Sequence, residues 1–212
     1  MRVGIDEAGR GSLIGPMVVA GVAIDESKLN FLKNMGVKDS KQLTRERREK
    51  LFSLLSNIVE AFVVVKVFPE DIDVYNLNDL TYNAVMKIIL TLSIYNPSVI
   101  TVDKVGDEKP VIELINKLGY KPNVVHKADE LFVEASAASI IAKVVRDNYI
   151  NMLKEIYGDF GSGYPADPKT INWLKSFYKR SSIPPPIIRR SWKVLRSIAP
   201  LYYINKEGKR IW

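Results

Sequence analysis

The order of apolar segments along this chain predicts an α/β fold in which helices flank a mixed sheet. Two strand-like segments follow one another directly near the N-terminus, which is typical of an antiparallel pair. The later strand-like segments alternate with segments of helical periodicity, which indicates a sheet covered by helices. The third observation is charge: residues 169–212 hold eleven Lys and Arg but one acid, a net charge of +10 in a chain of +7. We therefore expect a basic helical extension at the C-terminal end.

Each element is predicted from the spacing of its apolar residues. Apolar or β-branched runs predict strands at 2–5, 16–24, 61–67, 98–102 and 123–126. Apolar residues three or four apart predict helices at 27–35, 44–58, 77–95, 110–118, 130–157 and 168–179, and a basic helix from Arg189. Thr44 is expected to cap its helix, because a threonine hydroxyl accepts a free backbone N–H there. The small residues 135–139 are expected to let their helix lie close to the sheet.

The composition excludes several kinds of site. The 212 residues include no Cys and one His, which rules out disulfides, thiolate zinc sites, iron–sulfur clusters and multi-histidine metal sites. A metal would have to be bound mainly by oxygen, which favours a hard ion such as Mg²⁺ or Mn²⁺. The longest apolar run, residues 17–24, is far shorter than the ~18–20 residues that span a membrane. Asp6 and Glu7 interrupt any signal peptide, so we expect a soluble, cytoplasmic protein with no membrane partner.

Four carboxylates lie at the ends of predicted strands. Asp6 and Glu7 follow the first strand, Asp103 follows the strand at 98–102, and Asp129 comes soon after the last strand. Burying an unpaired charge costs several kcal/mol, so these acids do not serve to fill a core. If the strands are parallel neighbours, the carboxylates converge on one edge, where two hard cations ~3.5–4 Å apart would offset their repulsion. The alternative is that each acid is a helix cap or a loop residue.

A glycine-rich turn follows the first two acids. The segment Gly9-Arg10-Gly11, continued by Gly15-Pro16, has neither the spacing of a dinucleotide fingerprint nor the Gly-Lys-Ser/Thr of a phosphate-binding loop. Its backbone N–H groups and its arginine can still meet a phosphate or a sugar hydroxyl. The basic end of the chain is likewise typical of a surface that binds polyanions, and the alternative is an ordinary solvated helical face.

Together these segments resemble a known family. The segment 4–11, Gly-Ile-Asp-Glu-Ala-Gly-Arg-Gly, is similar to the opening motif of ribonuclease HII, the type 2 ribonuclease H. Further segments agree in order: Val37-Lys38-Asp39-Ser40-Lys41, Val102-Asp103, Lys127-Ala128-Asp129, residues 137–144 with Arg146-Asp147, and Gly161-Ser162-Gly163-Tyr164-Pro165. The resemblance spans roughly residues 3–196 and is greatest to the single-chain archaeal branch.

The resemblance implies a ribonuclease H-like catalytic domain over residues 1–165, with a basic helical extension over 166–212 packed on it. It implies an endonuclease that depends on Mg²⁺ or Mn²⁺, hydrolyses the RNA strand of RNA/DNA hybrids and cuts at ribonucleotides embedded in duplex DNA. Carried over by motif, the metal-binding catalytic acids are Asp6, Glu7, Asp103 and Asp129. Our hypothesis is that two ions held by these acids activate a water and stabilise the leaving 3′-oxygen, which gives 5′-phosphate and 3′-hydroxyl ends.

The resemblance also implies contacts with the substrate. The turn of Gly9, Arg10 and Gly11, together with Tyr164, would recognise the ribose 2′-hydroxyl, the group that distinguishes ribose from deoxyribose. Two lysines, Lys41 and Lys143, fall in motifs near the substrate backbone and are assigned to phosphate contact. The chain departs from the family at position 12, where serine replaces the proline of many members.

Two rival functions and two further expectations complete the interpretation. A junction resolvase or integrase-like nuclease on a similar fold would cut all-DNA substrates and would give Tyr164 no role. A non-catalytic nucleic-acid-binding module would use the basic end and leave the four acids unexplained.

Residues 207–212 lack the Gln-x-x-apolar-x-x-aromatic-aromatic pattern by which some relatives dock on a sliding clamp, so clamp docking is doubtful. We expect a monomer, because no long apolar stripe is left over once the helices pack.

Overall fold

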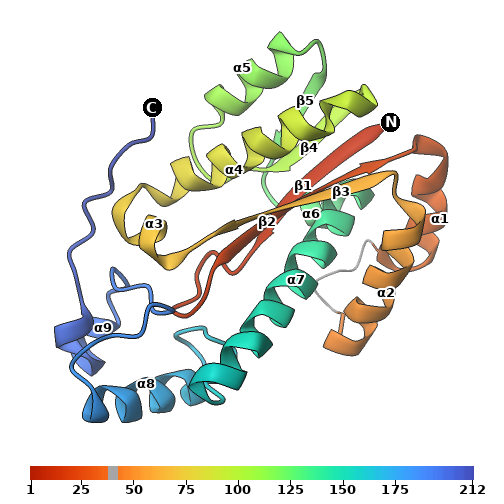
Figure 1. Cartoon of the computed structure of the whole chain (residues 1–212). Helices are drawn as coiled ribbons and strands as arrows, with labels where there is room; N and C mark the ends of the chain where they lie inside the picture. Colours follow the sequence, from red (N-terminus) through yellow and green to blue (C-terminus); the bar gives the residue numbers. More distant parts are fainter. Residues whose placement is uncertain (38–42) are drawn as a thin grey trace. The chain divides into compact units, whose positions relative to one another are not determined.

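The protein has a five-stranded sheet, seen in a computed structural model that describes residues 1–37 and 43–212. The strands lie in the order β3-β2-β1-β4-β5 (Figure 1). Their bounds are β1 Arg2–Ala8, β2 Met17–Ile24, β3 Ala61–Val67, β4 Val99–Asp103 and β5 Lys121–Val125. β1 pairs antiparallel with β2 and parallel with β4, and β4 pairs parallel with β5. The predicted mixed sheet is therefore confirmed.

The first strand is longer than predicted. The strand expected at 2–5 continues to Ala8, because β2 pairs with it as far as Ala8 and Val18. The parallel ladder between β1 and β4 ends earlier, at Ile5 and Val102. The acidic pair at positions 6 and 7 thus lies in the part of β1 that runs past its ladder with β4.

The helices follow the predicted order with differences at three places. Their bounds are η1 Glu26–Lys28, α1 Leu29–Asn34, α2 Arg45–Ile58, α3 Pro69–Val74, α4 Leu77–Leu92, η3 Ser93–Tyr95, α5 Lys109–Lys117, α6 Ala128–Leu131, α7 Val133–Tyr157, α8 Pro168–Arg180, α9 Leu195–Ile198 and η4 Pro200–Tyr202. Thr44 caps α2 as predicted, with its Oγ1 accepting the N–H of Arg47 at 3.2 Å. No helix among the described residues has the length and the apolar character needed to cross a membrane.

The single helix predicted over 130–157 is wrong. Phe132 has extended backbone angles, φ −125° and ψ 131°, and separates the one-turn α6 from α7. The start of α6 is set by the sheet edge, because the Asp103 carboxylate accepts the N–H of Ala128 at 2.9 Å. The short helix α3 lies where sequence periodicity predicts no element.

The basic helix predicted from Arg189 is also wrong. Its backbone N–H groups bond outside the segment: that of Arg189 donates to the Leu13 carbonyl at 2.9 Å. The N–H groups of the next two residues, Arg190 and Ser191, donate to the carboxylate of Asp73 at 2.9 Å each. The segment forms turns before α9 instead of a helix. The helix predicted over 168–179 is confirmed as α8.

The chain divides into two compact units. Unit 1 comprises Met1–Ala8, Val18–Lys66 and Thr81–Val145, and unit 2 comprises Gly9–Met17, Val67–Leu80 and Arg146–Trp212. The predicted division into a catalytic domain over residues 1–165 and a basic extension over 166–212 stays a prediction.

Helices cover both faces of the sheet within unit 1 (Figure 1). On one face, residues of β1 and β2 such as Val18 and Val22 share a buried core with α1, α2 and α7. The N-terminal part of α7 lies directly on β1, because a Cβ added at Gly4 would be 2.5 Å from the backbone nitrogen of Ala135. The small residues 135–139 allow this approach, as predicted. On the other face, a Cβ added at Gly21 would collide with Ile88 of α4.

Aromatic residues hold the core of unit 2. The Phe160 and Trp173 ring centroids are 5.5 Å apart, and those of Trp173 and Phe177 are 5.2 Å apart. Tyr178 meets Tyr202 edge to face at 5.1 Å. The aromatic residues interleaved with the basic charges therefore serve mainly to pack this unit.

Candidate active site

Three carboxylates meet where β1 and β4 end. One oxygen from each of Asp6, Glu7 and Asp103 lies within 4.8 Å of the other two, and this is the one group of three metal-type ligands among the described residues. The strand register explains the meeting: Ile5 lies beside Val102, so the residues that follow are Asp6 and Asp103. The predicted convergence on one sheet edge is confirmed for these three acids. We call them the acid cluster.

The fourth acid, Asp129, lies in α6 and is 5% exposed. The contact between Asp103 and the N–H of Ala128 brings α6 to the same edge of the sheet. Asp129 is close enough to raise the pKa of Asp6, although its oxygens lie outside the acid cluster. The sequence thus predicts the position of the acid but not its distance from the others.

Burial is the main cause that raises the pKa of Asp6 well above its ordinary value. The negative charges of Glu7 and Asp129 raise it further. A buried carboxylate among like charges costs free energy unless a cation neutralises it. Carboxylate oxygens are the ligands that Mg²⁺ and Mn²⁺ prefer. The donor set of unit 1 therefore fits a divalent metal.

The glycine turn, residues 9–11, lies in unit 2 and is held through its carbonyl groups. The carbonyl of Gly9 accepts from the Ser12 hydroxyl at 2.9 Å and from Nη2 of Arg189 at 2.6 Å. The same guanidinium donates to the carbonyls of Arg10 at 2.8 Å and Gly15 at 2.9 Å. The serine that departs from the family pattern thus supports the turn through its hydroxyl.

The Arg10 side chain extends to the start of α4, within unit 2. Its Nη1 donates to the Leu77 carbonyl at 3.5 Å, and its Nη2 donates to Oδ1 of Asn78. The carbonyl of Arg10 is bound at the same time by Arg189. Both the backbone and the side chain of this residue are therefore fixed by the protein.

Tyr164 is half-buried and lies in unit 2 after the turn at Gly163. The Cζ atom of Arg146 lies 4.6 Å from the centre of its ring. Nη2 of Arg146 donates to the Ser162 carbonyl at 3.1 Å, and a Cβ added at Gly9 would be 2.5 Å from Cδ of the same arginine. Arg146 therefore touches both segments that the resemblance assigns to ribose recognition.

The two predicted phosphate contacts differ in what the structure describes. Lys143 is half-buried on α7 and belongs to unit 1, as do the four acids. Lys41 lies outside the described residues.

Sequence reasoning misses the function of two buried arginines. Arg146 stands out only as part of the Arg146-Asp147 motif, and Arg189 only as one cation of the basic end. Arg189 is fully buried, and burial, followed by the charge of Arg146, lowers its pKa to about 9. In sequence, an arginine that binds backbone carbonyls cannot be distinguished from a surface arginine. The one signal for Arg146 is therefore the family motif that contains it.

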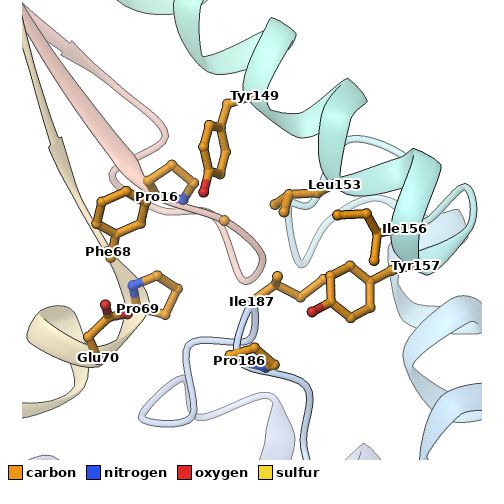
Figure 2. Close-up of a pocket in the computed structure, with 11 residues that line it drawn as sticks. Pro16, Phe68, Pro69, Glu70, Tyr149, Leu153, Ile156, Tyr157, Pro186 and Ile187 are labelled. Atoms are coloured by element: carbon orange, nitrogen blue, oxygen red, sulfur yellow. The ribbon is translucent and has the colours of Figure 1, made fainter.

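Unit 2 also contains an apolar pocket of about 240 Å³ (Figure 2). The Phe68 and Tyr149 rings lie 6.0 Å apart in its wall, and Leu153 and Ile187 line it further. Glu70 is the one carboxylate among its lining residues. A hydrolytic centre needs more than one group that binds metal or moves protons. The acid cluster therefore remains the candidate active site.

A mixed sheet with a cluster of metal-type carboxylates at one edge, in a chain with a strongly basic end, is typical of metal-dependent nucleases. The ribonuclease HII family model matches residues 3–195. The ribonuclease HII of Saccharolobus solfataricus is 79% identical over the full length of both chains. This chain belongs to the ribonuclease HII family.

Solved structures of relatives agree with this assignment. Ribonuclease H2 from Pyrococcus horikoshii OT3 superposes with a TM-score of 0.83 at 44% identity, covering 95% of this chain and 98% of that one. The ribonuclease HII in a PCNA complex from Archaeoglobus fulgidus gives a TM-score of 0.82 at 41% identity, with 95% and 96% covered. The protein is a metal-dependent endoribonuclease that acts on the RNA strand of RNA/DNA hybrids.

Proposed function

We propose that the enzyme also cuts at ribonucleotides embedded in duplex DNA, by a two-metal-ion mechanism that leaves 5′-phosphate and 3′-hydroxyl ends. The observation that carries this proposal is the acid cluster, with three carboxylates within 4.8 Å and Asp129 buried nearby. We assign Asp6, Glu7, Asp103 and Asp129 as the metal ligands and catalytic acids.

The four acids differ in what they contribute. Two divalent ions, when bound, would activate a water and stabilise the leaving 3′-oxygen. Asp6 is buried beside the negative charges of Glu7 and Asp129, which supports its assignment as a residue that would hold a divalent ion. Asp103 holds the start of α6 by accepting the N–H of Ala128, and its carboxylate is also part of the acid cluster. Mg²⁺ and Mn²⁺ both suit this oxygen donor set.

Ribose recognition is assigned to the glycine turn and to Tyr164. A 2′-hydroxyl both donates and accepts hydrogen bonds, so backbone N–H and C=O groups of Gly9, Arg10 and Gly11 can bind it in one orientation. The Tyr164 ring would stack against the neighbouring sugar. The close fixing of the turn by Arg189 and Ser12 supports this role, because a preorganised site distinguishes one hydroxyl more sharply than a mobile one.

The basic end of the chain is assigned to the phosphates of the duplex. Its net charge of +10 lies within 44 residues. Each phosphate that such a surface neutralises releases counterions, so affinity is expected to fall steeply as salt increases. Lys143, and Lys41 outside the described residues, would add phosphate contacts near the scissile bond.

The proposal includes a cytoplasmic monomer, and docking on a sliding clamp through residues 207–212 is not part of it. The backbone of Lys209 bonds to Val74 and Asn76, and the carboxylate of Asp79 accepts from Arg210 and Ile211. A clamp would have to compete with these contacts for the same segment. Light scattering of the purified protein with and without the clamp measures both the subunit number and the docking.

Cleavage of three end-labelled duplexes tests the proposal: an RNA/DNA hybrid, DNA with one ribonucleotide, and all-DNA, each with Mg²⁺, Mn²⁺ or EDTA. We expect metal-dependent cutting of the first two and none of the third. Cutting of the hybrid alone would contradict the single-ribonucleotide activity. Cutting of all-DNA would favour the resolvase-like rival, and binding without cutting would leave a binding module.

A further inference from the structure

We propose that Arg146 is a positioning residue for ribose recognition, which holds the Tyr164 ring and the Gly9 turn in a fixed relation. The inference rests on the proposed function of these two segments. All of the groups involved belong to unit 2, so their contacts lie within one compact body.

The contacts of Arg146 reach two separate segments. Its guanidinium lies 4.6 Å from the centre of the Tyr164 ring and donates from Nη2 to the Ser162 carbonyl. Its Cδ and Nε pack against Gly9, where an added Cβ would collide with both atoms. The side chain is 4% exposed, and its Nε is buried without a hydrogen-bond partner among the described residues. Such burial of a cation costs free energy that a surface arginine avoids.

Gly9 has the backbone angles and the missing Cβ that this contact requires. Its φ of 77° is in the left-handed region, and a Cβ would also be 2.9 Å from the carbonyl oxygen of Pro16. Arg189 holds the same turn through the carbonyls of Gly9, Arg10 and Gly15. The turn is thus fixed by one arginine, and a second arginine links it to the tyrosine.

An arginine is suited to this position in a way that a lysine is not. The planar guanidinium can stack on an aromatic ring while its N–H groups donate in the plane. Tyr164 is half-buried and lies in a loop, so without the stack its ring would regain rotamer freedom. A displacement of about 1 Å at a group that orients the substrate can cost on the order of 100-fold in rate.

A double-mutant cycle tests whether Arg146 acts through Tyr164. We measure kcat and KM on DNA with a single ribonucleotide for the wild type, Arg146→Met, Tyr164→Ala and the double variant. We expect R146M to lower kcat/KM roughly tenfold to 100-fold in the wild type but less than about threefold in the Y164A background. Full loss in both backgrounds would overturn the proposal.

Two further variants separate positioning from folding and from charge. Arg146→Lys keeps the charge and the buried stem but not the stack on Tyr164. It should therefore show the same loss of kcat/KM, and it serves as the test if R146M unfolds. Wild-type activity of R146K would overturn the inference. Arg196 stacks on Tyr203, a different ring, at the same 4.6 Å. R196M removes the same charge, so any loss it causes should be the same in the wild-type and Y164A backgrounds of the cycle. If Tyr164→Ala alone retains full activity, the ribose-recognition assignment fails instead.

Discussion

The acid cluster of unit 1 and the glycine turn of unit 2 are built in different ways. Strand register brings the acids together, because Ile5 lies beside Val102 and the next residues are Asp6 and Asp103. The turn is held instead by Arg189, a side chain 180 residues away from Gly9 in the sequence. Backbone pairing thus places the groups assigned to cutting, and buried side chains place the groups assigned to recognition. The two sites should therefore fail differently when they are altered.

The largest expected effect comes from the acid cluster. Asp6→Asn should lower kcat on the RNA/DNA hybrid by at least about 1,000-fold, because removing a metal ligand removes the electrostatic stabilisation of the transition state. Its binding of the hybrid should remain within about threefold of the wild type, measured by fluorescence anisotropy. Normal turnover of D6N would refute the assignment of this acid as a metal ligand.

The next largest effect concerns the glycine turn. Gly9→Ala should lower cleavage at a single ribonucleotide by about 100-fold, because its Cβ would collide with Arg146 and displace the turn. Gly119→Ala is the matched control, since Gly119 has a similar φ of 82° but open space around its Cβ. That control should lose about 1–2 kcal/mol of stability and no activity. Equal losses of activity in both variants would contradict the role of the turn.

Arg189 should matter more for stability than the acids do. Arg189→Met would remove the donor to the carbonyls of Arg10 and Gly15, each costing about 1–3 kcal/mol, and would leave the Gly9 carbonyl bound by Ser12 alone. We expect a loss of about 3 kcal/mol or more in the free energy of unfolding, measured in urea. Arg180→Met, which removes an exposed arginine from α8, should change it by less than about 0.5 kcal/mol.

The smallest effect is the stability of the metal-free acid cluster. Since the pKa of Asp6 is raised in the folded protein, the folded state binds its proton more tightly, and stability should fall as pH rises from the ordinary value through the raised pKa. In EDTA at neutral pH, D6N should therefore have a higher Tm than the wild type, by about 2–4 °C for each kcal/mol of repulsion relieved. Mg²⁺ should reverse the order. A lower Tm for D6N in EDTA would contradict the repulsion.

The sequence predicts the acid cluster better than the glycine turn, because strand register places the acids and buried side chains place the turn. Acids at strand ends can be found from apolar periodicity, because parallel strands bring their carboxyl ends to one edge. Asp6, Glu7 and Asp103 meet as that rule predicts. The buried contacts of Arg146 and Arg189 cannot be found this way, since they join segments that no periodicity relates.

Two of the predicted helices differ from the structure. The segment from Arg189 has helical periodicity, but its N–H groups bond to Leu13 and Asp73 from distant parts of the chain. Phe132 divides the long predicted helix where α6 follows the sheet edge at Asp103. At the first place distant contacts hold the segment in turns, and at the second one extended residue separates two helices.

The separation of cutting from recognition is tested most directly by binding with an inactive enzyme. We would measure the affinity of D6N for a duplex with one ribonucleotide and for the same all-DNA duplex in Mg²⁺, and repeat both with the double variant D6N/G9A. The account predicts that D6N binds the ribonucleotide duplex several-fold more tightly and that the double variant loses this preference. Loss of the preference in D6N alone, or its survival in D6N/G9A, would contradict the account.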